Sequence, residues 1–124
     1  MPFQAFFEVD SARNYNKTVL KNLWLNDKRD IPLRRLPKMK TGYMAGPAFT
    51  NANLAVDPNL PAPIGTVCPE CLFPPTYGEL SGFTLDQIRD LSKWYNDSFG
   101  IDEQNDNVQV RREKFVQFIQ NLVD

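Results

Sequence analysis

Prolines are concentrated in the middle third of this chain, and their positions limit what it can fold into. Nine of the ten lie between residues 30 and 80, at Pro32, Pro37, Pro47, Pro58, Pro61, Pro63, Pro69, Pro74 and Pro75. Because proline fixes φ and removes a backbone donor, this tract cannot be an interior helix or a central strand. Apolar and aromatic residues are scattered among the prolines, which is not the composition of a disordered linker. We therefore expect an extended segment that lies on another protein.

Six apolar side chains of the tract are the expected contacts with that protein. They are Phe49, Leu54, Leu60, Leu72, Phe73 and Tyr77. The prolines between them already restrict the free chain, so docking costs less conformational entropy than it would for a flexible segment. The sequence predicts a partner-binding tract over residues 30–82.

A basic arm surrounds the start of the tract. Its positive residues are Lys28, Arg29, Arg34, Arg35, Lys38 and Lys40, and the one acid among them is Asp30. Such an arm favours a negatively charged partner surface. Few aromatic residues are interleaved with the charges, although sites for single-stranded nucleic acid normally stack bases on aromatic rings. A solvated or protein-facing arm is the preferred interpretation, and contact with nucleic acid is the alternative.

Helical patterns flank the tract on both sides. Asp10 or Ser11 can cap an N-terminal helix, and the apolar face of that helix would hold Tyr15, Val19, Leu20, Leu23 and Trp24. Further along, Thr84 and Gln87 have the spacing of a capping box, and Gly100 is a candidate left-handed stop. Two C-terminal helices are expected, with buried stripes at Ile88, Leu91 and Tyr95 and then at Phe115, Phe118, Ile119 and Leu122 in a helix of about 109–122.

These patterns predict a mainly α chain with extensive irregular, proline-rich structure. We expect an N-terminal tail and helix in residues 1–29, the extended tract with its basic start in residues 30–82, and a small helical hairpin module in residues 83–124. Two amphipathic helices joined by a loop can bury their stripes against each other. The last part is therefore the one expected to fold alone.

The C-terminal part also carries a family pattern. It comprises Thr84, Leu85, Ile88, Leu91, Phe99-Gly100-Ile101, Arg112, Phe115 and Ile119. With these residues, positions 83–122 resemble the helix–extended loop–helix group, which includes the SAP, LEM and Rho N-terminal-like modules. The resemblance implies a two-helix fold. Residues 82–124 hold five basic and eight acidic residues, which favours docking to a protein over contact with a nucleic-acid backbone.

Two cysteines have the spacing of half a zinc site. Cys68 and Cys71 are separated by two residues, and the chain has no histidine and no other cysteine. A structural zinc ion needs four nitrogen or sulfur ligands, so a partner chain would have to supply the rest. Free thiols are the preferred interpretation, with an intermolecular metal site and a disulfide as alternatives.

A second metal-like pattern lies between the two C-terminal helices. Asp102, Gln104, Asp106 and Glu113 occupy positions 1, 3, 5 and 12 of a calcium-loop template. The eighth position is Gln109, where such loops need an apolar residue to pair with a neighbouring loop. A polar connecting loop is the better interpretation, and no resident metal or cofactor is expected.

The sequence provides few of the usual catalytic groups. Without histidine, the most common general base near neutral pH is missing, and no glycine-rich phosphate loop or G-x-S-x-G motif occurs. The acids Asp86, Asp90 and Asp97 are expected on a solvated helix face. We therefore expect a protein that is not an enzyme.

Targeting signals are equally sparse. No apolar run approaches 18 residues, so no membrane span is expected. The start MPFQAFFEVD is acidic too early for a secretory signal, and the cysteine usage fits a reducing compartment or a particle-associated protein.

Together these features favour a structural or adaptor subunit of a large assembly, such as a minor capsid, cement or connector protein of a phage or virus particle. Its expected partners are other protein subunits, which it would contact through the extended tract. One alternative is an accessory subunit of a cytoskeletal or organellar complex. The other is a nucleic-acid-associated module that uses residues 28–40, for which affinity would fall steeply with salt.

Overall fold

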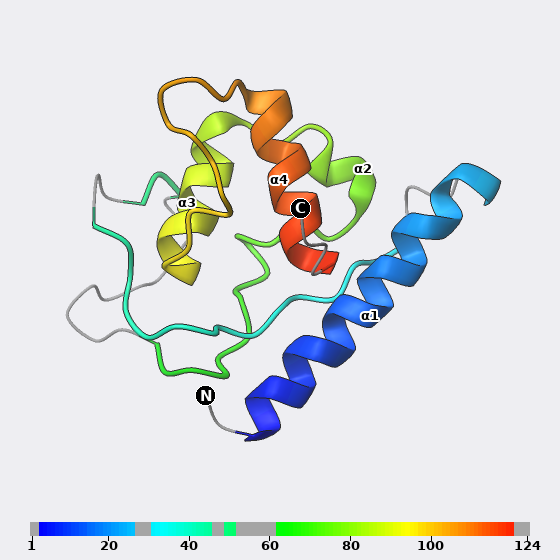
Figure 1. Cartoon of the computed structure of the whole chain (residues 1–124), viewed down its shortest axis with the longest axis horizontal. Helices are drawn as coiled ribbons and strands as arrows, with labels where there is room; N and C mark the ends of the chain where they lie inside the picture. Colours follow the sequence, from blue (N-terminus) through cyan, green and yellow to red (C-terminus); the bar gives the residue numbers. More distant parts are fainter. Residues whose placement is uncertain (1–2, 27–30, 46–48, 52–61, 121–124) are drawn as a thin grey trace.

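The computed structural model describes residues 3–26, 31–45, 49–51 and 62–120. The chain is mainly helical. Its helices are α1 (Phe3–Asn26), α2 (Tyr77–Leu80), α3 (Leu85–Tyr95) and α4 (Val108–Gln120). Figure 1 shows α3 and α4 side by side, with α1 running past the end of α4 and irregular chain crossing between them. The sequence-based prediction of a mainly α chain is confirmed.

Helix α1 is longer than the sequence pattern indicated. It begins at Phe3, whereas the predicted start was at Asp10 or Ser11. The residues before Asp10 include no glycine, and Pro2 precedes the helix, so nothing interrupts helical hydrogen bonding there. The described buried residues of α1 are Val9, Ala12, Asn16, Val19 and Leu20, which fall on one face at helical spacing.

Two members of the predicted α1 face, Leu23 and Trp24, have side chains outside the described part of the structure. Tyr15 is half-buried and packs at the edge of the core. The face that α1 turns inward contacts α4. The buried polar residue Asn16 lies at this contact, since its side chain donates to the Ile119 carbonyl of α4.

Helix α3 starts with the predicted capping box. The Thr84 hydroxyl accepts a hydrogen bond from the Gln87 backbone N–H at 3.2 Å, and the Gln87 side chain accepts one from the Thr84 N–H at 2.8 Å. The helix ends at Asn96, whose φ of 54° is left-handed, and Gly100 (φ 76°) lies beyond the cap. The predicted stop was thus four residues late, because asparagine also tolerates the left-handed conformation.

The hydrophobic core draws on all parts of the described chain. Ile88 and Leu91 of α3 belong to one buried cluster with Phe115 and Ile119 of α4. The same cluster contains residues from α1 and from the proline-rich tract, at Ala12, Val19, Leu20, Leu33, Leu36, Cys68, Leu72 and Phe73. The tract is therefore part of the chain's own core.

Leu72 and Phe73 require a correction to the predicted partner contacts. Their exposed fractions are 3% and 2%, and the Phe73 ring lies edge-on to the Phe115 ring with centroids 5.8 Å apart. The apolar faces of α3 and α4 need cover from a third element, and these side chains supply it. They are not available as anchors for another protein in this structure.

In residues 31–45 and 62–76, the tract is held without a regular sheet. Two isolated antiparallel bridges join Pro32 to Thr76 and Pro37 to Val67. Next to these bridges, the Leu33 N–H donates to the Pro75 carbonyl at 2.8 Å, and the Lys38 N–H donates to the Thr66 carbonyl at 2.8 Å. Prolines remove many of the donors that a continuous ladder would need, so the two segments touch at a few points.

Candidate interaction groove

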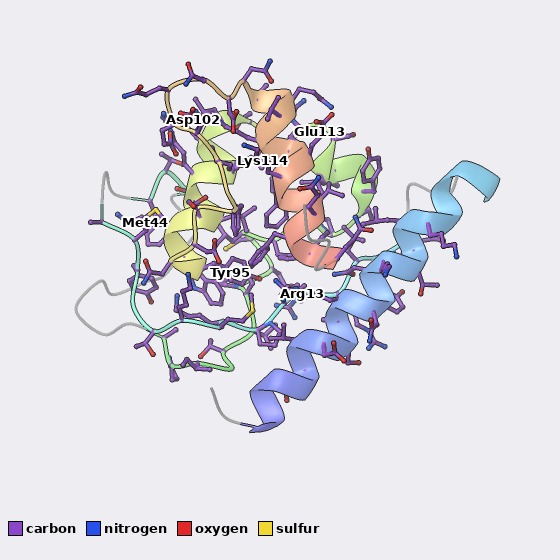
Figure 2. The ribbon with its side chains drawn as sticks, in the orientation of Figure 1. Arg13, Met44, Tyr95, Asp102, Glu113 and Lys114 are labelled. Carbon is purple, nitrogen blue, oxygen red and sulfur yellow. The ribbon has the colours of Figure 1, made fainter. Side chains whose placement is uncertain are left out.

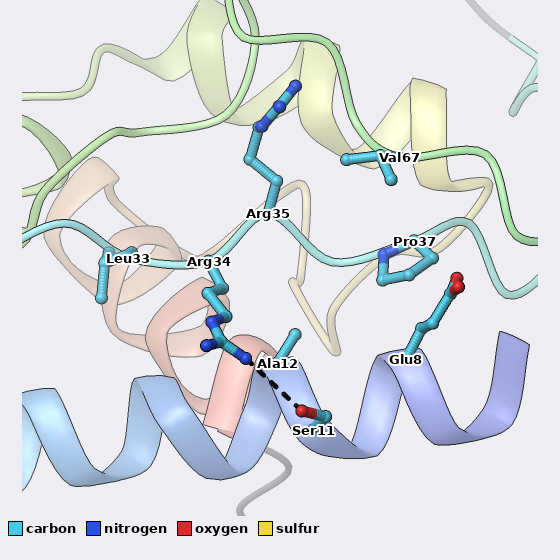
Figure 3. Close-up of a pocket in the computed structure, with 8 residues that line it drawn as sticks. All are labelled: Glu8, Ser11, Ala12, Leu33, Arg34, Arg35, Pro37 and Val67. Atoms are coloured by element: carbon cyan, nitrogen blue, oxygen red, sulfur yellow. Dashed lines mark hydrogen bonds between the residues drawn. The ribbon is translucent and has the colours of Figure 1, made fainter.

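An open groove lies between α1 and the first segment of the tract. It is lined by Glu8, Ser11, Ala12, Leu33, Arg34, Arg35, Pro37 and Val67, and its volume is about 680 Å³. Figure 3 shows residues 33–37 running alongside α1, with Val67 beyond them on the second segment. We refer to this hollow as the Arg34 groove. It brings residues of the N-terminal helix together with both halves of the proline-rich tract.

The spacing between its two walls is set by Asn16. This fully buried amide accepts a hydrogen bond from the Arg34 N–H at 2.7 Å and donates one to the Arg34 carbonyl at 3.0 Å. It also lies 3.4 Å from the Ile119 carbonyl, to which it donates. A helix side chain thus takes the place of a neighbouring strand for Arg34. As a result, α1, the tract and α4 are joined at one point.

Arg34 presents its guanidinium on the α1 side of the groove. The group lies 4.5 Å from the centroid of the Tyr15 ring, and its Nη1 is 3.5 Å from the Ser11 hydroxyl oxygen. Within the residues that the structure describes, no carboxylate forms an ion pair with Arg34. An exposed guanidinium held against an aromatic face keeps its charge and part of its hydrogen-bonding capacity.

Arg35 has a different role from its neighbour. Its side chain points away from α1 (Figure 3) and donates to the Cys68 carbonyl at 2.9 Å. It also lies 3.6 Å from the carboxylate of Glu70, whose side chain is 86% exposed. A water-exposed pair at that distance contributes little. The hydrogen bond to Cys68 therefore makes Arg35 mainly a link between the two segments of the tract.

The apolar part of the groove includes an exposed side chain. Val67 is 46% exposed and stands out as the exposed large hydrophobic residue within the described ranges. Its neighbour across the antiparallel bridge is Pro37, and Leu33 is buried at the base of the same wall. On the wall formed by α1, Glu8 lines the end of the groove that lies near Pro37 and Val67 (Figure 3).

Lys38 does not behave as a member of a solvated basic arm. It is fully buried, and its ammonium donates to the Trp94 carbonyl. The rings of Tyr43 and Trp94 lie 5.0 and 4.8 Å from its Nζ. Burial lowers the pKa of Lys38 to about 8. The prediction of an exposed basic residue here is corrected, because the aromatic rings and the carbonyl replace water around the charge.

The rest of the basic arm is not continuous either. Lys40 is exposed and lies 3.8 Å from the Asp97 carboxylate. Lys28 and Arg29 lie outside the described residues. Of the four described members of the arm, Arg34 and Arg35 both line the groove, but Arg35 and Lys40 have carboxylate neighbours and Lys38 is buried. Arg34 is therefore the described groove arginine without a carboxylate partner.

The remaining predicted partner contacts are divided between described and undescribed residues. Phe49 is half-buried, and its ring lies edge-on to Tyr43 with centroids 5.7 Å apart. Tyr77 is half-buried at the start of α2. Leu54 and Leu60 lie outside the described residues. A role for Phe49 and Tyr77 in binding a partner stays a prediction.

Asp90 is a buried structural residue, and the prediction that it lies on a solvated helix face is wrong. It is 4% exposed and accepts hydrogen bonds from the Thr50 N–H at 2.9 Å, the Thr50 hydroxyl at 2.7 Å and the Asn51 N–H at 3.0 Å. It therefore fixes part of the tract against α3 and is not on a solvated face. Its position one turn before Trp94, on the same side of the helix, was a signal of burial.

The loop between α3 and α4 uses its carboxylates internally. The Asp102 side chain accepts hydrogen bonds from the Asn105 amide at 2.7 Å and from the Gln104 N–H at 3.0 Å, and these bonds lower its pKa. Lys114 donates to the Asp106 carboxylate at 2.6 Å. Figure 2 shows Asp102 and Lys114 at this end of the molecule. Within the described residues, no group of three or more potential acidic or cysteine ligands surrounds one point.

The two cysteines differ in environment. Cys68 is buried and Cys71 is exposed, and both are free thiols. Burial raises the pKa of the Cys68 thiol to about 12, so it is a poor nucleophile at neutral pH. An intermolecular metal site at Cys68 and Cys71, with ligands from a partner, stays the untested alternative to free thiols.

Comparison with known proteins gives no family for this chain. No protein-family model, no curated protein and no solved structure matches it. The resemblance of residues 83–122 to helix–extended loop–helix modules therefore rests on the residues quoted above. Among the described helices, none is both long enough and apolar enough to cross a membrane. The candidate site is thus defined by its geometry.

Proposed function

We propose that this chain is a non-enzymatic structural or adaptor subunit of a large assembly, such as a minor capsid, cement or connector protein of a phage or virus particle. One observation carries the proposal. The Arg34 groove combines an exposed apolar residue, Val67, with a guanidinium that has no carboxylate partner among the described residues. Exposed apolar side chains next to arginine are typical of surfaces that bind other proteins.

The use of the buried polar groups supports a structural role. Asn16 bonds the backbone of Arg34, Asp90 bonds the backbone at residues 50 and 51, and the buried Arg111 donates to the carbonyls of residues 103 and 106. Each of these side chains holds an irregular segment against a helix. These side chains make the hydrogen bonds that buried backbone N–H and C=O groups need. An irregular segment needs them because it lacks the backbone hydrogen bonds of a helix or sheet.

The burial of Leu72 and Phe73 changes how docking would occur. The proline-rich tract contributes its outer side to the Arg34 groove, at residues 33–37 and Val67, while its inner side fills the core. The chain would therefore present a formed surface to its neighbours, and its own tract would stay folded on binding. Phe49 and Tyr77 could extend that contact.

Two alternatives share part of this argument. An accessory subunit of a cytoskeletal or organellar complex would use the same groove on a different assembly. A nucleic-acid-associated module would use the basic arm at residues 28–40. The burial of Lys38 and the acidic neighbour of Lys40 reduce the exposed charge that such a module needs.

Co-sedimentation tests the proposed function. The full chain, tagged and expressed in its native source, is expected to travel through a density gradient with a large particle at moderate salt. A chain of 14.3 kDa that stays at the top of the gradient in every extract would contradict an assembly subunit. Release from the particle by nuclease treatment would support the nucleic-acid alternative.

A further inference from the structure

We infer that the Arg34 groove binds an extended segment of a partner protein in which one carboxylate side chain lies next to a branched apolar one. The carboxylate would pair with Arg34, and the apolar side chain would cover Val67. This inference rests on the proposed function, because it names the chemistry of the segment that an assembly partner would insert.

The first support is the state of Arg34. Its guanidinium is already positioned by the Tyr15 ring and the Ser11 hydroxyl, and Asn16 fixes its backbone from both sides. A planar guanidinium matches the geometry of a carboxylate, with two parallel hydrogen bonds. Because the side chain is held in place before binding, little rotamer entropy is lost when a carboxylate arrives.

The second support is the apolar wall. Val67 is exposed where it pairs with Pro37, and Leu33 and Ala12, which are themselves buried, form the apolar floor toward α1. Covering Val67 removes apolar area from water, which is favourable. An aliphatic side chain of the partner can lie on this wall while a neighbouring residue in the same segment reaches Arg34.

The third support is the charge at the other end. Glu8 lines the groove near Pro37 and Val67 (Figure 3), so the described lining at that end offers no second cation for another negative group. A nucleic-acid strand carries a phosphate at every nucleotide and would place negative charge along the whole groove. A protein segment can carry a single acid at the Arg34 end, and this favours protein over nucleic acid as the occupant.

The groove is also large enough to hold part of a partner segment. Its volume of about 680 Å³ lies within the usual range for ligand-binding clefts, about 300–1,000 Å³. The hydrogen bonds of Asn16 to Arg34 and to Ile119 fix one wall to the helices. The site therefore exists before the partner binds.

A titration with short peptides tests the inference on the full chain. The probes are the capped peptide Ser-Val-Asp-Leu-Ser and matched peptides with asparagine or lysine in place of the acid, followed by ¹⁵N–¹H NMR. We expect the amide signals of Ala12, Arg34 and Val67 to shift. The acidic peptide should bind about threefold to fivefold more tightly than the asparagine peptide, as for a partly exposed ion pair. That preference should shrink in 1 M salt.

Variants separate the two halves of the site. Arg34→Gln should abolish the preference for the acidic peptide, while Val67→Ser should weaken all three peptides about threefold by removing apolar contact. Lys17→Gln makes the same change of charge on α1 but does not line the groove, so the preference should remain. An unchanged thermal transition of Arg34→Gln would show that any loss comes from the site.

Three results would overturn the inference. They are peptide-induced shifts that avoid the groove, equal binding of the acidic and lysine peptides, and tighter groove binding by a 15-nucleotide oligothymidine than by any peptide. The proposed function is judged separately by co-sedimentation of the unaltered chain. If the chain enters the particle and the Arg34→Gln, Val67→Ser double variant enters equally well, the groove is excluded and the adaptor role stands.

Discussion

At the scale of single residues, Lys38 is a cation held entirely inside the protein. The Trp94 carbonyl accepts from its ammonium, and two aromatic rings face the charge. Among the described residues, no carboxylate lies in ion-pair contact with it. Loss of hydration therefore dominates, and it lowers the pKa of Lys38 to about 8.

This environment predicts a rise in stability between pH 8 and 9. Unfolded Lys38 keeps its proton up to its ordinary pKa of 10.5, whereas the folded protein releases it near 8. The unfolded state thus binds more protons across this range, and the free energy of unfolding increases with pH. If the unfolded state binds one proton more than the folded state, the free energy of unfolding rises by about 1.4 kcal/mol per pH unit. Urea unfolding at each pH measures it.

Above pH 9 the rise should stop. Burial raises the pKa of Cys68 from 9.0 to about 12, so the folded state now keeps a proton that the unfolded state loses, and the two slopes cancel. The raised pKa of the buried Tyr95 makes stability fall above pH 10. Lys38→Met should remove the rise between pH 8 and 9. If it leaves the rise intact, another group is responsible.

Asp90 leads to a second prediction at this scale. Asp90→Ala removes the acceptor for three hydrogen bonds from Thr50 and Asn51, and a buried donor left without its partner costs about 1–3 kcal/mol. We expect a loss of about 2–3 kcal/mol in chemical denaturation. Asp86→Ala, at an exposed position of the same helix, should change stability by no more than about 0.5 kcal/mol. Equal effects of the two substitutions would show that residues 50 and 51 are not held by Asp90.

At the scale of elements, α4 presents two phenylalanines with different surroundings. Phe115 is fully buried among the rings of Phe73 and Phe99. Phe118 is half-buried, lies 4.5 Å from Phe99 by ring centroid, and has the Arg13 guanidinium 5.0 Å from its ring. Figure 2 shows Arg13 on α1 facing this region. The first ring belongs to the α3–α4 core and the second to the seam with α1.

This difference predicts an order of stability effects. Phe115→Ala should cost about 3–5 kcal/mol, the usual range for a buried phenylalanine. Phe118→Ala should cost about half as much, because its ring already has contact with water. Denaturant unfolding of both variants provides the comparison. The reverse order would mean that the seam with α1 contributes more to stability than the α3–α4 contact.

Local patterns predicted that the chain is mainly helical, but they missed the start of α1 and the short α2, and they predicted the tract poorly. The capping box at Thr84 and the stripe through Phe115 and Ile119 follow from spacing within one helix. Asn16 was missed as a buried support for the groove wall, although it shares a face with Ala12 and Val19, because asparagine on a helix is usually solvated. Its role depends on a residue 18 positions away, and no local pattern encodes such a contact.

At the scale of the whole molecule, the proline-rich tract joins the helices together. It supplies Leu36, Leu72 and Phe73 to the core, and it is fixed by side chains of α1 and α3. Charge alone identified both Arg34 and Lys38 as members of a basic arm. Only the folded structure shows that Arg34 is exposed and Lys38 is buried. Composition reveals that a tract is apolar enough to bind something. It does not reveal that the partner is the same chain.

The last prediction concerns which part folds alone. The sequence favoured residues 83–124 as an independent module. In the structure, however, the buried faces of Ile88 and Phe115 share one cluster with the tract and α1. Removing residues 1–82 would expose that shared surface, and a domain of about 40 residues rarely stabilises itself without such cover. We therefore expect the 83–124 fragment to show fast amide exchange throughout.

The full chain should behave differently. The amides of Leu33, Lys38 and Gly65 donate to the backbone across the tract, so their exchange should be slowed together with that of α3, as expected for one cooperative unit. Hydrogen exchange on both proteins measures this directly. Slow exchange in the fragment, or fast exchange at these three amides in the intact chain, would restore the picture of a self-sufficient helical pair carrying a loose arm. The Arg34 groove would then lose one of its walls, because residues 33–37 would have no fixed place beside α1.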